Sequence, residues 1–249
     1  HAHNVSASVV ARALFVHGTP EQKSEYLPAI LRGERYFSLG YSEPEAGSDL
    51  ASLRTRAVKE GDDWIVNGQK LWTTNADKAQ YVWLAARTDP DVKQHAGISV
   101  FIVNLRSPGI TIRPGMAMYG RTFSTVFYDS VRVPSSAVVG GVNNGWRVIT
   151  GALVEELIML AGLHVAIVKR AFGNLTDYIR TATVGGKVLR NDPVIRDRIG
   201  ALAAEIEVAR QFLLRNTSMA EQGQAPRYEA AVSKIFLSEL QERLGQAAL

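Results

Sequence analysis

Residues 40–75 read GYSEPEAGSDLASLRTRAVKEGDDWIVNGQKLWTTN, and this stretch decides how the chain is organised. Its first part, GYSEPEAGSD, is rich in Gly, Pro, Ser and Asp, the residues that dominate turns. The part that follows alternates between apolar and polar residues, with EGDD and NG as turn signals between short strands. A polar loop followed by alternating segments predicts the beginning of a β-domain.

Helical patterns flank this β-rich region on both sides. Residues 5–18 favour a helix that ends at a Gly, and Thr19 then caps a second helix whose first position is a Pro. Residues 146–179 are apolar on nearly every side and predict a long helix buried against other helices. Further helices are expected to begin at residues 191–193 and at Pro226.

We therefore expect an α+β fold in three parts. Residues 1–35 form a helical segment, residues 36–138 an antiparallel β-barrel-like middle domain, and residues 139–249 an antiparallel helical bundle.

Composition narrows the classes of function. The chain has 249 residues, a net charge of +4 and no cysteine, which excludes disulfides, Fe–S clusters and thiolate zinc sites. The mild charge suits an anionic small molecule and does not argue for nucleic acid. No secretory signal opens the chain, and the most apolar run, residues 157–168, is too short to span a bilayer. We expect a cytoplasmic protein without a membrane span.

Sequence-readable nucleotide and zinc motifs are absent: the chain has no GxGxxG, no P-loop and no HExxH. Its five histidines are scattered without metal-ligand spacing, and His164 is interpreted as a core residue of the long helix. We expect no metal site.

Two stretches are candidate binding elements. GYSEPEAGSD is either an ordinary irregular turn or a site in which Gly40 and Gly47 let a ligand approach the backbone, with hydroxyls from Ser42 and Ser48. In LWTTN, Trp72 is either a core residue or a flat platform beside the donors of two threonines and an Asn.

Together these stretches resemble the middle domain of the acyl-CoA dehydrogenase flavoprotein family. The resemblance continues through FIVNLRSPGI, VFYDSVRVP and the GW that opens the long helix. TPEQKSEYLPAILRGE is similar to the end of that family's N-terminal helical domain. Most of that domain and the last part of the C-terminal bundle have no counterpart in the chain.

The resemblance implies FAD as the cofactor and assigns residues to it. Leu39, Tyr41 and Ser42 would line the flavin, with Ser42 hydrogen-bonded to the ring. Gly47 and Ser48 would approach the pyrophosphate and the bound thioester. Trp72 would pack on the flavin, and Thr74 would bond near N5, the hydride acceptor.

α,β-Dehydrogenation requires a base, and the resemblance places it on the long helix at Glu155, with Glu156 beside the substrate. From the residues alone, this pair is also compatible with a solvated first helical turn. The family's usual residue at position 156 is an arginine, and adjacent carboxylates in a dry site raise each other's pKa. Other family members carry the base later in the bundle, beyond residue 249.

A second departure lies in residues 178–193. Many relatives have Arg and Phe where this chain has Ala182 and Gly185, and those side chains reach the FAD of a neighbouring subunit. Arg180 and Lys187 are the nearby cationic alternatives.

The leading interpretation is an FAD-dependent acyl-CoA dehydrogenase acting on a thioester of CoA or an acyl-carrier protein. The resemblance implies a homodimer, homotetramer or hetero-oligomer, with electron-transfer flavoprotein or a similar acceptor as partner. One alternative is a non-catalytic partner subunit of a hetero-oligomeric dehydrogenase. Another is a flavin oxidase or hydroxylase of the same fold.

Overall fold

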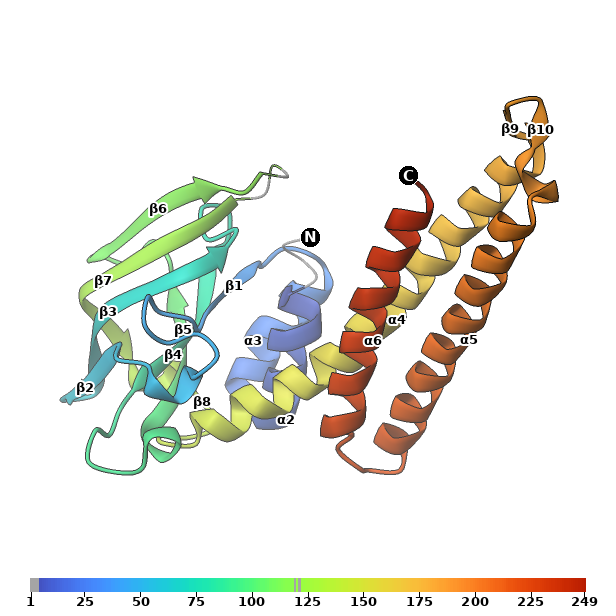
Figure 1. The fold of residues 1–249 in the computed structure, drawn as a ribbon. Coiled ribbons are helices and arrows are strands. Elements are labelled where there is room, and N and C mark those ends of the chain that lie inside the picture. Colours follow the sequence, from blue (N-terminus) through green and yellow to red (C-terminus); the bar gives the residue numbers. More distant parts are fainter. Residues whose placement is uncertain (1–4, 119, 121) are drawn as a thin grey trace. The chain divides into compact units, whose positions relative to one another are not determined.

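The computed structural model describes residues 5–118, 120 and 122–249, apart from the side chain of Glu155. The chain divides into two compact units, residues 1–153 and 154–249. The fold is mixed α+β, with a β-sheet domain followed by C-terminal helices (Figure 1), which confirms the predicted fold class.

The first unit begins with three short helical segments, η1 (Ser6–Val10), α2 (Ala11–His17) and α3 (Pro20–Leu31). Thr19 caps α3 as predicted: its side chain accepts from Gln22 N at 3.2 Å, and Gln22 Oε1 accepts from Thr19 N at 3.1 Å. α2 and α3 lie together beside the sheet (Figure 1).

Eight strands form the sheet of the first unit, in the order β6-β7-β3-β2-β4-β5-β8, with β1 added beside β4. Their bounds are β1 Phe37–Gly40, β2 Arg56–Glu60, β3 Asp63–Thr74, β4 Tyr81–Arg87, β5 Ile98–Asn104, β6 Ile110–Met116, β7 Thr122–Pro134 and β8 Val138–Val139. Short 3-10 turns are η2 (Leu50–Ser52), η3 (Gln94–Gly97) and η4 (Ser135–Ala137). Most pairings are antiparallel, but β1–β4 and β2–β4 are parallel, which the sequence did not predict.

The central strands β4 and β5 are covered on both faces, which explains why YVWLAAR and ISVFIVN are almost continuously apolar. Trp83 and Ile102 face a core that they share with Val9 and Ile30 from the N-terminal helices. Residues of the opposite parity, such as Phe101, face a second core built within the sheet.

The NG turn predicted within the β-region is wrong. Asn67 and Gly68 lie inside the single strand β3, where its register against β7 shifts between Val66 and Gly68. Gly68 has φ +147°, and a Cβ there would lie 2.7 Å from the Cα of Thr55. The glycine therefore permits a bulge and a close backbone approach instead of a reversal.

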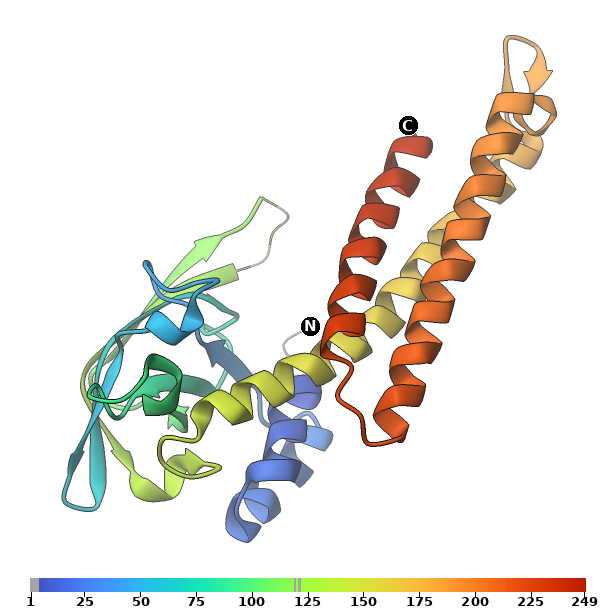
Figure 2. The same cartoon turned by 60° about the horizontal axis from the view of Figure 1, so that its bottom comes forward.

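Long helices make up most of the second unit. α4 (Gly145–Thr181) begins in the first unit and continues into the second, followed by the hairpin β9 (Thr183–Val184) and β10 (Lys187–Val188), then η5 (Leu189–Asn191), α5 (Pro193–Glu221) and α6 (Arg227–Ala247). Asp192 caps α5 by accepting from Val194 N at 2.8 Å. Figure 2 shows the antiparallel course of α5 and α6, whose apolar stripes meet α4 in a third core around Val168, Leu202 and Leu240.

α4 agrees with the predicted helix to within two residues at each end but is less buried than the sequence predicted. Met159, Leu163 and Ile167, spaced four residues apart on one face, are each more than 40% exposed in this chain. By length and composition alone the helix could cross a bilayer, with an 18-residue window of mean hydropathy 1.8. The core helix of a soluble protein passes the same test, so this property is weak support for a membrane span.

Candidate functional site

The two motifs identified in the sequence meet at one cavity of about 220 Å³ in the first unit. Its lining consists of Val5, Leu39, Tyr41, Ser42, Leu71, Trp72 and Thr74. The structure thus brings five of the residues predicted to hold flavin, those at positions 39, 41, 42, 72 and 74, to a single place.

One backbone hydrogen bond and one side-chain hydrogen bond join the segments that form the two walls of this cavity. Leu71 N donates to Ser42 O at 2.8 Å, and the hydroxyl of Ser38 donates to Thr74 O at 2.9 Å. β1 therefore leads the first wall, residues 39–42, directly alongside the second wall, residues 71–74.

Trp72 is directed outward by an irregular strand end. The register of β3 against β7 shifts between Lys70 and Thr73, and Trp72 has the left-handed φ of +59°. A bulky residue in that conformation is strained, and such strain is concentrated at functional sites. Trp72 is 58% exposed, and its ring lies 4.9 Å from the ring of Phe123, so the alternative that Trp72 is a core residue is wrong.

The glycines of the first motif have different roles. A Cβ on Gly40 would lie 2.8 Å from Val82 Cγ2, so packing of β1 on β4 requires this glycine and no ligand is needed to explain it. A Cβ on Gly47 would meet no atom of the described residues within 4 Å. Gly47 and Ser48 are exposed on the loop between β1 and η2, outside the lining of the cavity. Their predicted contact with pyrophosphate and thioester stays a prediction.

A buried ion pair, missed by the sequence reading, lies beside the walls. Lys70 Nζ donates to Glu43 Oε1 at 2.7 Å and to Tyr41 O at 2.9 Å. Burial lowers the pKa of Lys70 to about 8, although Glu43 opposes the shift. Burial also disfavours the Glu43 carboxylate, but the charge of Lys70 and hydrogen bonds from Lys70, Arg54 and Thr55 outweigh it and lower its pKa. The sequence held one signal for this burial. Lys70 is an even number of residues from Trp64 and Val66 along the strand, so its side chain is expected on the same inward face.

The proposed base lies in the second unit. Glu155 is within α4, and its side chain lies outside the described part of the structure. Glu156 is half-buried, and burial raises its pKa above the ordinary value for a glutamate. Carboxylates with a shifted pKa are frequent at functional sites.

Of the positions that depart from the family pattern in this region, Ala182 directly precedes a tight hairpin and Gly185 lies in its turn. Gly185 and Gly186 have φ of +55° and +77° and make the two-residue turn between Val184 and Lys187. The turn itself therefore explains Gly185. Arg180 pairs with Asp177 at 3.0 Å on the exposed end of α4.

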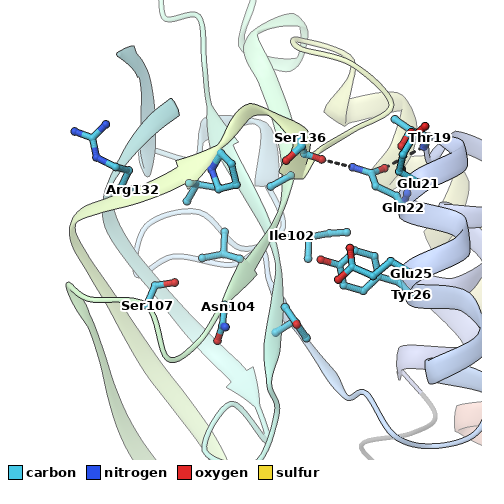
Figure 3. Close-up of a pocket in the computed structure, with 15 residues that line it drawn as sticks. Thr19, Glu21, Gln22, Glu25, Tyr26, Ile102, Asn104, Ser107, Arg132 and Ser136 are labelled. Atoms are coloured by element: carbon cyan, nitrogen blue, oxygen red, sulfur yellow. Dashed lines mark hydrogen bonds between the residues drawn. The ribbon is translucent and has the colours of Figure 1, made fainter. Parts of the chain in front are cut away.

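A second cavity, of about 360 Å³, lies between α3 and the sheet (Figure 3). Gln22 crosses its edge and donates to Ser136 O at 2.7 Å and to Val138 O at 2.9 Å. None of the residues predicted to contact flavin or substrate lines it. Within the described residues, no group of three His, Asp or Glu side chains could hold a metal ion.

The first cavity has the chemistry that a flavin ring requires. An isoalloxazine is flat and has polar atoms along its edges, and the cavity combines an exposed indole, aliphatic side chains and the hydroxyls of Ser42 and Thr74. Among the described residues, the Thr74 hydroxyl makes one contact, with Trp72 O at 3.4 Å. The residues present fit the group that the sequence resemblance implied.

The fold and this cavity define a protein with a flavoprotein-like β-domain and a C-terminal helical domain, and comparison with known proteins makes the assignment specific. Residues 38–131 match the acyl-CoA dehydrogenase middle domain, and residues 143–249 match the acyl-CoA dehydrogenase C-terminal domain. The chain belongs to the acyl-CoA dehydrogenase family.

Similar proteins include acyl-CoA dehydrogenase FadE29 of Mycobacterium tuberculosis, 41% identical over 98% of this chain and 62% of that protein. Among solved structures, the Tcur3481-Tcur3483 steroid ACAD is 35% identical with a TM-score of 0.90, covering 99% of this chain and 62% of that one. The ChsE4-ChsE5 complex of Mycobacterium tuberculosis is 37% identical with a TM-score of 0.86. The match covers 98% of this chain and 65% of that one. The chain thus spans about three fifths of the length of these relatives.

Proposed function

We propose that this chain is part of an FAD-dependent enzyme that introduces an α,β double bond into an acyl thioester. The observation that supports this most directly is the meeting of GYS and LWTT, two motifs separated in sequence, at one cavity with the chemistry of a flavin site. Bound FAD would supply the two-electron acceptor for the hydride that leaves the β-carbon.

The chain's own residues would hold the cofactor and orient the substrate. Ser42 and Thr74 would donate or accept hydrogen bonds at the polar edge of the ring, and Trp72 would pack against its face. Leu39 and Tyr41 complete the wall. The exposed loop at Gly47 and Ser48 offers backbone and hydroxyl groups for the pyrophosphate and the thioester.

Glu155 is proposed as the base that removes the α-proton. The α-C–H bond breaks and its proton passes to the carboxylate, while the electron pair forms the new double bond as the β-hydrogen leaves as hydride. Glu156, whose pKa is raised by burial, would lie beside the substrate and favour this transfer by remaining uncharged over a wider pH range.

A hetero-oligomer is the assembly that we favour over a homo-oligomer. Two structural relatives, the Tcur3481-Tcur3483 steroid ACAD and the ChsE4-ChsE5 complex, each carry the names of two polypeptides. A steroid thioester is therefore a candidate substrate in addition to a straight-chain acyl-CoA. We propose electron-transfer flavoprotein as the electron acceptor. The proposed location of the protein is the cytoplasm. The alternative of a non-catalytic partner subunit has the same support from these pairings.

Anaerobic titration of the purified yellow protein with straight-chain and steroid acyl-CoA thioesters tests the proposal. We expect bleaching of the flavin band with at least one of them and loss of bleaching in Glu155→Gln. Bleaching that survives in Glu155→Gln would refute the base. A protein that takes up flavin but is bleached by no thioester favours the partner-subunit alternative, and oxygen consumption driven by NADH and a reductase favours the oxidase or hydroxylase alternative.

A further inference from the structure

One buried ion pair, outside the lining of the cavity, connects its two walls. The side chain of Lys70 is completely buried, and that of Glu43 is only 7% exposed. Lys70 directly precedes Leu71 in the second wall. Its ammonium binds Tyr41 O and the carboxylate of Glu43, the residues on either side of Ser42 in the first wall.

The same carboxylate also closes the loop that carries Gly47 and Ser48. Glu43 Oε2 accepts from Arg54 N at 2.6 Å, and Oε1 accepts from Thr55 N at 2.9 Å. At the near end, Glu43 N donates to Ala46 O at 2.8 Å. Glu43 therefore holds the near end of the loop through its backbone and the far end through its carboxylate, which is itself held by Lys70.

Stability alone is a poor explanation for this arrangement. Burying two charges costs more free energy than their attraction commonly returns, and apolar pairs of similar volume are often at least as stable. A charged pair, however, fixes the relative positions of the segments that carry it, because each donor must lie at hydrogen-bond distance from its acceptor. Here every one of those bonds ends on a segment that forms the cavity or its loop.

We propose that Glu43 and Lys70 are positioning residues that set the separation of the two cavity walls required for flavin binding. The inference rests on the proposed function, because it concerns the same cavity. It differs from a purely structural role in one respect: replacing the pair should impair flavin binding even where stability is restored.

The test compares Glu43→Gln, Lys70→Met and the double variant with the purified wild-type protein. FAD affinity is measured by titrating the apoprotein and following flavin fluorescence, the spectrum of bound flavin is recorded, and stability is measured by thermal melting. Leu105→Ala is the matched control, since Leu105 is 5% exposed in the second sheet core and is not part of the cavity lining.

We expect each single variant to raise the Kd for FAD by about tenfold or more, equivalent to about 1.4 kcal/mol. The double variant should regain much of the melting temperature but not the affinity, and its bound flavin should show an altered visible spectrum. Leu105→Ala should lower the melting temperature and leave the Kd unchanged.

Three results would overturn the inference while leaving the proposed function intact. They are an unchanged Kd in both single variants, recovery of affinity together with stability in the double variant, and an equal loss of affinity in Leu105→Ala. A wild-type protein that binds no FAD would instead refute the proposed function, and the inference with it.

Discussion

Lys70 allows a quantitative test of how the protein tolerates a buried charge. Burial is the largest influence on its ammonium, the nearby charge of Arg87 acts in the same direction, and Glu43 offsets only part of both. The pKa in the folded protein is consequently about 8, against an ordinary value of 10.5. Protonation of Lys70 is thus less favourable in the folded than in the unfolded state.

The sign of the pH dependence follows from the protons bound in each state. Below about pH 8 both states carry the proton, whereas between about 8 and 10.5 the unfolded chain holds it and the folded protein has released it. The free energy of unfolding therefore rises with pH through this window. The difference between 10.5 and about 8, at about 1.4 kcal/mol per pKa unit, corresponds to an increase in the free energy of unfolding of about 3–4 kcal/mol across the whole window.

Urea unfolding of wild type and Lys70→Met, at steps of about one pH unit from about pH 7 to 10, measures this contribution. The free energy of unfolding of the wild type, minus that of Lys70→Met, should increase as pH rises. Lys78→Met removes an exposed lysine and controls for the loss of one positive charge. A difference that stays constant or falls across this range would refute the reasoning, because Lys70 would then keep its proton in the folded protein.

Three further predictions concern packing, capping and the flavin platform. Gly40→Ala places a methyl group 2.8 Å from Val82 Cγ2 and should lower the free energy of unfolding, measured by urea unfolding, by about 1–3 kcal/mol. An unchanged urea midpoint would show that β1 can move away from Val82. Thr19→Ala removes the acceptor for Gln22 N and should cost about 1 kcal/mol in thermal melts, and an unchanged melting temperature would show that the cap contributes nothing to stability. Trp72→Ala should raise the Kd for FAD about tenfold in fluorescence titrations, and an unchanged Kd would exclude the indole as a platform.

Local sequence signals predicted the elements well where neighbouring residues determine the structure. The cap at Thr19, the start of α5 after Asp192 and the EGDD turn between β2 and β3 each depend on residues a few positions apart. The α+β order follows from the change between periods of two and 3.6 residues.

The same local signals failed where a distant segment sets the backbone. Asn67 and Gly68 have the composition of a hairpin turn, but the approach of Thr55 and the pairing with β7 keep them inside one strand. The apolar composition of α4 predicted burial on nearly every side, but composition does not specify how many helices are present to cover it.

For the candidate site, the sequence by itself determined which residue types are available: hydroxyls, a tryptophan and a polar loop in two recognisable motifs. Only the tertiary structure decided that Leu39, Ser42, Trp72 and Thr74 line one cavity and that Trp72 faces outward. It also decided that Lys70 meets Glu43, which is 27 residues away. The physical reason is that strand register and the bulge in β3 depend on the pairing of whole strands, whereas composition and periodicity report only on each segment in isolation.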